Sequence, residues 1–96
     1  MPIISEETIK LLNNHLNEEH YSANLYFNMA GWCSKQGLKG CASFLNNHSA
    51  EEHTHLEKLN EFIKKVDGQP VMGAMKEPEH SFSSAEEVFE KIVKHE

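Results

Sequence analysis

The pattern of apolar and polar positions predicts a long first helix over residues 6–35. Apolar residues recur at alternating steps of three and four from Ile9 to Cys33, and Glu19 is the single charged member of this stripe. Such spacing places the stripe along one face of a helix. Ser5 suits the N-cap position, because its side chain can accept a hydrogen bond from the first turn.

A second helix is expected over residues 39–66, with a stripe of its own at the same spacing. Asp67 and Gly68 end it, and Pro70 prevents it from resuming. The break at 36–40 is short and contains two glycines, so the two helices must lie antiparallel as neighbours. The stripe expected to be buried consists of Cys41, Leu45, His48, Glu52, His55, Leu59, Phe62 and Val66.

Residues 67–82 are expected to form a long crossover, since they contain two glycines and two prolines and have no helical period. At this length the crossover can return along the hairpin and start a third helix parallel to the second. Two overlapping capping boxes, Ser83 with Glu86 and Ser84 with Glu87, predict that this helix begins near residue 84. Its stripe is still running at residue 96, where no cap follows, so we expect an incomplete third helix over 84–96.

These elements predict an all-α fold in one domain, residues 1–96. The fold class is a four-helix bundle, to which this chain contributes an antiparallel αα-hairpin, a long crossover and part of a third helix. The uncapped end indicates that the bundle is continued by further sequence or by another chain.

Composition narrows the classes of partner. The net charge of −6 and a pI near 5.6 argue against nucleic acid and anionic membranes, and favour cations. The sequence has no apolar signal segment and no run long enough to cross a bilayer, so we expect a cytoplasmic protein with free thiols at Cys33 and Cys41. A local disulfide across the Gly37 turn is the alternative that the spacing allows.

The most informative spacing is Glu-x-x-His at Glu52 and His55. Three residues apart on a helix, these side chains project about a turn apart from one face and can reach one metal ion. Glu19 lies 18 residues before Gly37 and His55 lies 18 residues after it, so both fall at one height of the hairpin. Counting from the start of the third helix brings Glu96 to the same layer.

Three carboxylates buried in one layer predict a bound cation, because isolated buried charges are costly and like charges resist ionising side by side. Carboxylates with imidazole suit iron or manganese better than structural zinc. Four-helix bundles enclose two such ions with a Glu from each of two helices and a Glu-x-x-His from each of the others. Glu19, Glu52 and His55 supply half of that formula. The alternatives are a hydrogen-bonded polar pair at Glu52 and His55, and a solvated helix-face charge at Glu19.

Four segments follow one another along the chain: LNEEHYSANLYF at 16–27, AGWCS at 30–34, FLNNHSAEEHTHLEKL at 44–59 and VFEKIVKHE at 88–96. Through these segments the sequence resembles the non-haem bacterial ferritins along its whole length. The resemblance implies that Glu19, Glu52 and His55 form a first iron site. It also implies that Glu52 bridges to a second iron, which Glu96 binds, so the implied cofactor is a di-iron centre.

The same resemblance implies an auxiliary role for Tyr26 beside the site and places Glu51 in an accessory third metal site. From the residues alone, Tyr26 is an ordinary stripe aromatic, and Glu51 lies one step off the stripe, where a solvated charge is usual. His48 is expected to be a core histidine. The sequence provides no partner for the other histidines, most of which are expected on the surface: His15, His20, His53, His80 and His95.

The resemblance further implies a ferroxidase. In that family, iron(II) is oxidised by dioxygen or peroxide, and the ferric product is stored in the cavity of a 24-subunit shell. Bacterioferritins bind haem through a methionine that follows the ligand glutamate. His53 stands at that place, so no haem is expected.

Two alternative functions remain open. The first is an iron-binding dimer of hairpins without storage, in which two copies of Glu19, Glu52 and His55 complete a symmetric di-iron site. For a chain of only 96 residues, a dimer or larger assembly is expected. The second is a metal-free helical module that docks a partner helix on its open apolar stripe.

Overall fold

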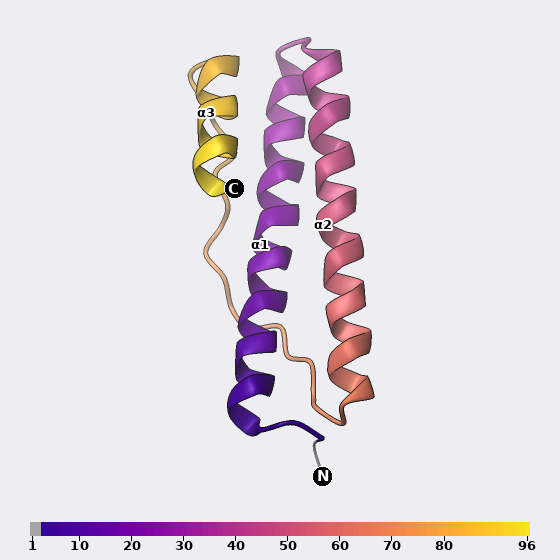
Figure 1. Ribbon diagram of the computed structural model, residues 1–96. Coiled ribbons are helices and arrows are strands. Elements are labelled where there is room, and N and C mark those ends of the chain that lie inside the picture. Colours follow the sequence, from indigo (N-terminus) through magenta and orange to yellow (C-terminus); the bar gives the residue numbers. More distant parts are fainter. Residues whose placement is uncertain (1–2) are drawn as a thin grey trace.

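The computed structural model describes residues 3–96, and within this range it contains three helices and no strand. They are α1 (Glu6–Lys35), α2 (Lys39–Lys65) and α3 (Ala85–His95). α1 and α2 form an antiparallel hairpin, and α3 packs beside α1 near the hairpin turn, running parallel to α2 (Figure 1). This confirms the predicted all-α fold. None of the three helices is long and apolar enough to span a membrane.

The helix ends follow from local hydrogen bonding. The Ser5 side chain accepts from the Thr8 amide at 3.1 Å, and the Ser84 side chain accepts from the Glu87 amide at 3.1 Å. Each bond satisfies an amide that lacks a partner in the first turn. Gly37 adopts φ 81° in the hairpin turn, a left-handed conformation that costs glycine little. The starts of α1 and α3 and the turn after α1 are therefore set by two serines and a glycine whose roles can be recognised in the sequence.

Asparagine side chains on one face of α1 hold the crossover, residues 67–82, in place. Asn13 accepts from the Val71 amide at 2.8 Å, and Asn17 accepts from the Gly73 amide at 2.8 Å while donating to the Val71 carbonyl at 2.9 Å. Asn28 donates to the Pro78 carbonyl at 3.2 Å. These bonds satisfy backbone groups of a segment that has no helix or sheet of its own. The crossover therefore runs back along α1, as Figure 1 shows.

The hydrophobic core is divided into two clusters. The larger cluster, near the hairpin turn, includes Tyr26, Met29, Leu45 and Val88. The smaller cluster, toward the other end of the hairpin, consists of the buried residues Leu16, Leu56 and Ile63. Between the clusters, Ser49 is buried and donates to the Ala23 carbonyl at 2.8 Å. A polar layer thus interrupts the core midway along the hairpin.

The buried face of α2 differs from the stripe expected from the sequence. The residues of α2 that are buried are Ala42, Leu45, Ser49, Leu56 and Ile63. His55 and Phe62, which the expected stripe placed inside, are exposed, and only Leu45 belongs to both sets. α2 carries apolar residues on two adjacent faces, and α1 packs against the face with the small residues Ala42 and Ser49. The expected stripe therefore lies one position away from the true contact.

Candidate metal centre

The polar layer brings together Glu19 from α1 with Glu52 and His55 from α2. The three residues present ligand atoms that all lie within 4.8 Å of one another. His55 Nδ1 is 3.5 Å from Glu19 Oε2 and 3.7 Å from Glu52 Oε2. Their helical positions explain this, because Glu52 and His55 are one turn apart and the hairpin sets Glu19 opposite them. The counting argument from Gly37 predicted this proximity.

Burial makes this cluster a good fit for a cation. The side chains of Glu19 and Glu52 are each 15% exposed, whereas that of His55 is 53% exposed. Glu19 Oε2 is buried and has no hydrogen-bond partner within residues 3–96. A carboxylate oxygen in this position is unfavourable unless a positive charge compensates it. The donor set of two carboxylates and one imidazole matches the preferences of iron and manganese.

The electrostatic interaction of Glu19 with Glu52 also favours the binding of a cation. Burial raises the pKa of Glu52 from its ordinary value of 4.5 to about 7, and the neighbouring Glu19 carboxylate adds to the increase. His55 opposes this shift, while Glu96 reinforces it. The two carboxylates of the cluster therefore repel each other in a partly buried position, and binding a cation would relieve this repulsion.

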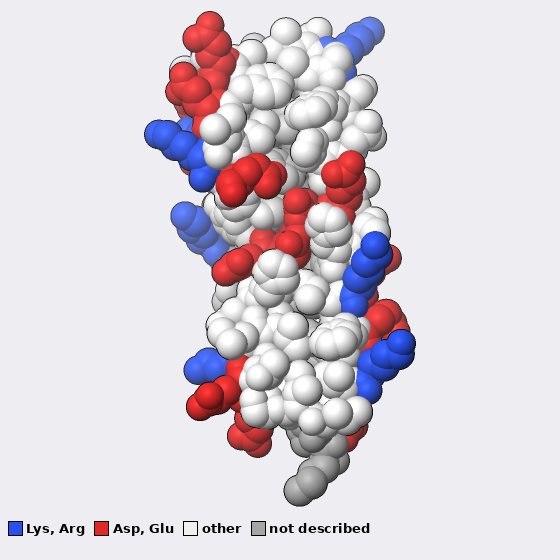
Figure 2. Space-filling model, in the orientation of Figure 1, with Lys and Arg blue, Asp and Glu red and all other residues white. Residues whose placement is uncertain are grey.

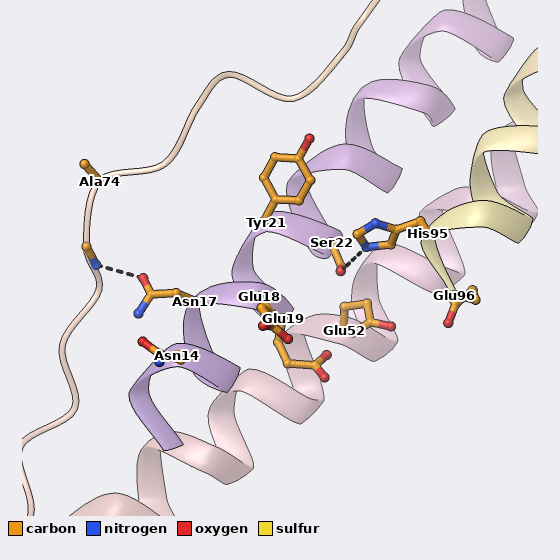
Figure 3. A pocket seen from close by; sticks show the side chains of 11 residues that line it. Asn14, Asn17, Glu18, Glu19, Tyr21, Ser22, Glu52, Ala74, His95 and Glu96 are labelled. Carbon is orange, nitrogen blue, oxygen red and sulfur yellow. Dashed lines mark hydrogen bonds between the residues drawn. The ribbon is translucent and has the colours of Figure 1, made fainter. Parts of the chain in front are cut away.

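The cluster opens into a cavity of 760 Å³ whose lining includes Glu18, Glu19, Glu52, His95 and Glu96. Figure 3 shows these side chains around the cavity, with Asn17 and Ala74 on its other side. In the space-filling view, acidic side chains form a band across the middle of the molecule (Figure 2). The cavity is wide enough to admit a hydrated ion and is bordered by α1, α2, the crossover and the end of α3.

Glu96 lies at this cavity but outside the three-residue cluster. Its carboxylate accepts a hydrogen bond from the Tyr26 hydroxyl. Tyr26 is fully buried, and burial together with this bond raises the pKa of its hydroxyl, so the group remains a hydrogen-bond donor. His48 and His95 contact the Tyr26 ring edge to face, with centroid separations of 5.7 and 5.9 Å. Tyr26 thus links the end of α3 to the hairpin.

The structure bears differently on the sequence-based interpretations of Glu51 and His48. Glu51 is exposed on α2 and does not belong to the group of three ligand atoms found within residues 3–96. His48 is partly buried and packs against Phe44 with the two rings tilted and their centroids 4.5 Å apart, in keeping with a packed histidine. The accessory role of Glu51 therefore stays a prediction.

Three polar contacts at the site were missed from the sequence. His15 Nε2 lies 3.3 Å from Glu19 Oε1, and His15 Nδ1 lies 3.9 Å from Glu18 Oε2. His95 Nε2 is 2.6 Å from the Ser22 hydroxyl. The signal for His15 was its spacing four residues before Glu19, which places both side chains on one face. His95 could not be paired without knowing where α3 docks.

Residues 9–96 match the family model of the ferritin-like domain. A probable bacterial non-heme ferritin-like protein of Haemophilus influenzae is 42% identical over 94 residues, covering 98% of this chain and 57% of the relative. A bacterial non-heme ferritin of Campylobacter jejuni is 40% identical over 94 residues, covering 98% of this chain and 56% of the relative. The chain therefore spans about half the length of these relatives.

A comparison with solved structures also supports a ferritin-like fold. An engineered closed form of the Archaeoglobus fulgidus ferritin, made by site-directed mutagenesis, has a TM-score of 0.91 and 34% sequence identity to this chain. The match covers 96% of this chain and 56% of the archaeal one.

Proposed function

Because the chain belongs to the ferritin-like domain family, we propose that it binds iron(II) at Glu19, Glu52 and His55 and takes part in iron oxidation and storage. The observation that supports this most directly is the buried, unsatisfied Glu19 oxygen within a cluster of two carboxylates and an imidazole. The names of the relatives, a probable non-heme ferritin-like protein and a non-heme ferritin, support the same class of function.

In the proposed reaction iron is the substrate. Binding of iron(II) displaces the proton that the raised pKa of Glu52 retains near neutral pH. The hard carboxylate oxygens of Glu19 and Glu52 stabilise iron(III) more than iron(II), so they favour loss of an electron. Two iron(II) ions each give one electron to dioxygen, which takes up two protons to form hydrogen peroxide. With peroxide as the oxidant, two iron(II) ions again give one electron each, the O–O bond breaks, and two protons complete two waters.

A second iron position is proposed at Glu96, with Glu52 bridging the two ions. Both carboxylates line the same cavity, and Tyr26 holds Glu96 through its hydroxyl. Glu51 is proposed as an accessory ligand on the exposed side of α2. Further ligands would come from another copy or from sequence that continues the bundle. In the complete assembly, proposed as a cytoplasmic 24-subunit shell, the oxidised iron is stored as mineral.

The test is an iron oxidation assay in air, followed by the ultraviolet absorbance of the ferric product. The wild-type chain should oxidise iron(II) faster than buffer, and E52A should lose most of this rate. E57A is the matched control, because Glu57 is an exposed glutamate on the same helix. If E52A oxidises iron at the wild-type rate, the proposal is wrong.

The hairpin dimer is a second candidate, favoured by the apolar side chains left exposed on one chain. Phe44 and Phe62 are each 47% exposed, Phe89 is 37% exposed and Val93 is 75% exposed. Burying such side chains drives association. Sedimentation would separate the candidates: a discrete two-chain species with iron oxidation supports the dimer, whereas a many-subunit species supports the shell. F62S should weaken either assembly.

A further inference from the structure

Glu19 has an imidazole at each of its two oxygens. His55 Nδ1 lies 3.5 Å from Oε2, on the inner side of the cluster, and His15 Nε2 lies 3.3 Å from Oε1. The His15 side chain is 55% exposed and sits on α1 one turn before Glu19. The buried oxygen Oε2 of Glu19 thus faces Glu52 and His55, while its other oxygen faces a histidine in contact with solvent.

The separation of His15 Nε2 and Glu19 Oε1 suits a shared metal ion. Nitrogen and oxygen ligands lie about 2.0–2.2 Å from a first-row divalent ion, so two adjacent ligand atoms of that ion are roughly 3.0–3.5 Å apart. The observed 3.3 Å falls within this range. If His15 were instead protonated, the contact would be an exposed ion pair of little energetic value.

Glu18 supports the same arrangement from the other side of the ring. Its carboxylate lies 3.9 Å from His15 Nδ1 and also lines the cavity. Histidines that bind metals usually turn their second ring nitrogen toward a carboxylate, which fixes the tautomer and strengthens the ligand. Nδ1 of His15 faces the Glu18 carboxylate beyond hydrogen-bond distance, and Nε2 faces Glu19.

We propose that His15 and Glu19 form an outer binding position for a divalent iron-group cation, from which the ion passes to the Glu19–Glu52–His55 cluster. Glu19 serves both positions, with Oε1 facing the outer ion and Oε2 facing the inner one. The ion moves inward by exchanging the first oxygen for the second. The transfer step rests on the proposed iron chemistry, whereas the outer binding position does not.

The binding position is tested with Zn²⁺ alone, which undergoes no oxidation, by histidine-selective ¹H–¹⁵N NMR. In wild type and in E52Q, Zn²⁺ should shift the His15 imidazole resonances. H15Q should remove one binding step from a calorimetric titration, and E18Q should weaken it by roughly tenfold. H53Q is the matched control, because His53 is an exposed histidine of α2 outside the His15–Glu19 pair, and it should leave binding unchanged.

The outcomes separate this inference from the proposed function. Unshifted His15 resonances in both wild type and E52Q would overturn the outer position, even if iron oxidation depends on Glu52. His15-dependent zinc binding in E52Q supports it, even if iron oxidation proves independent of Glu52. The transfer step predicts that H15Q slows oxidation several-fold at low iron concentration; an unchanged rate would refute that step. Since His15 is exposed, H15Q should fold normally, and E18Q gives a second test that retains the histidine.

Discussion

At the scale of single residues, Glu52 and Glu19 carry charges that the fold by itself accommodates poorly. Both side chains are mostly buried, they lie beside each other, and burial raises the pKa of Glu52 to about 7. Structural carboxylates usually have lowered pKa values because hydrogen bonds stabilise their charge. The opposite shift in Glu52, caused by burial and the neighbouring Glu19, is typical of carboxylates at functional sites.

This shift predicts a particular dependence of stability on pH in the metal-free protein. Between pH 4.5 and about 7 the folded state retains the Glu52 proton while the unfolded state loses it, so stability falls as the pH rises through this window. E52Q removes the titration. Its free energy of unfolding, relative to wild type, should increase between pH 4.5 and 7 and stay level above pH 7. Urea denaturation measures this difference, and an E52Q advantage that did not change with pH would contradict the account.

Tyr26 offers a second residue-level prediction. Y26F keeps the buried ring but removes the hydroxyl that donates to Glu96. Because the acceptor is a carboxylate, loss of this bond should lower the free energy of unfolding by about 1.5–3 kcal/mol. Y21F is the control, because Tyr21 is only partly buried and contacts His95 through its ring. Equal denaturation midpoints for Y26F and wild type would show that the bond contributes nothing to docking of α3.

At the scale of elements, the hairpin positions the site and the crossover returns the chain to it. Asn17 makes two crossover bonds, to the Val71 carbonyl and from the Gly73 amide. Together with Asn13 and Asn28 it replaces the regular backbone pairing that the crossover lacks. Because the crossover borders the cavity at Gly73 and Ala74, these bonds also shape one wall of the site.

N17A should therefore loosen the crossover without unfolding the hairpin. The Gly73 amide should exchange with solvent at least several-fold faster, because its hydrogen-bond acceptor is lost. N47A, an exposed asparagine on α2, is the control for the change in helix propensity. Hydrogen exchange followed by NMR measures this protection. An unchanged exchange rate at the Gly73 amide in N17A would show that Asn17 does not hold the crossover in place.

The helices and the crossover also show how much of the fold could be predicted from the sequence. Serine caps and glycine turns act locally, so the hairpin, the crossover and the start of α3 were predictable, as was the common height of Glu19 and His55. The face of α2 that meets α1 was not, since Phe62 and Ile63 lie on neighbouring faces that both carry apolar residues. The pairing of His95 with Ser22 depends on where α3 docks, which no local pattern specifies.

At the scale of the whole molecule, the chain encloses only part of a bundle. Its core is split by a polar layer, and apolar side chains remain exposed along α2 and α3. The relatives that it matches are nearly twice as long. We expect the open side of the candidate metal site to be closed by a second copy or by further sequence, as the exposed His55 indicates.

The central claim is that Glu19, Glu52 and His55 bind iron(II), and an anaerobic titration tests it most directly. Calorimetry on wild type, E52A and E57A would give the affinity of each chain for iron(II) before any oxidation. The account predicts saturable binding by wild type and E57A, and an affinity lower by about 100-fold or more in E52A, because loss of a ligand should cost at least as much as loss of a supporting residue. Equal binding by all three chains would contradict it.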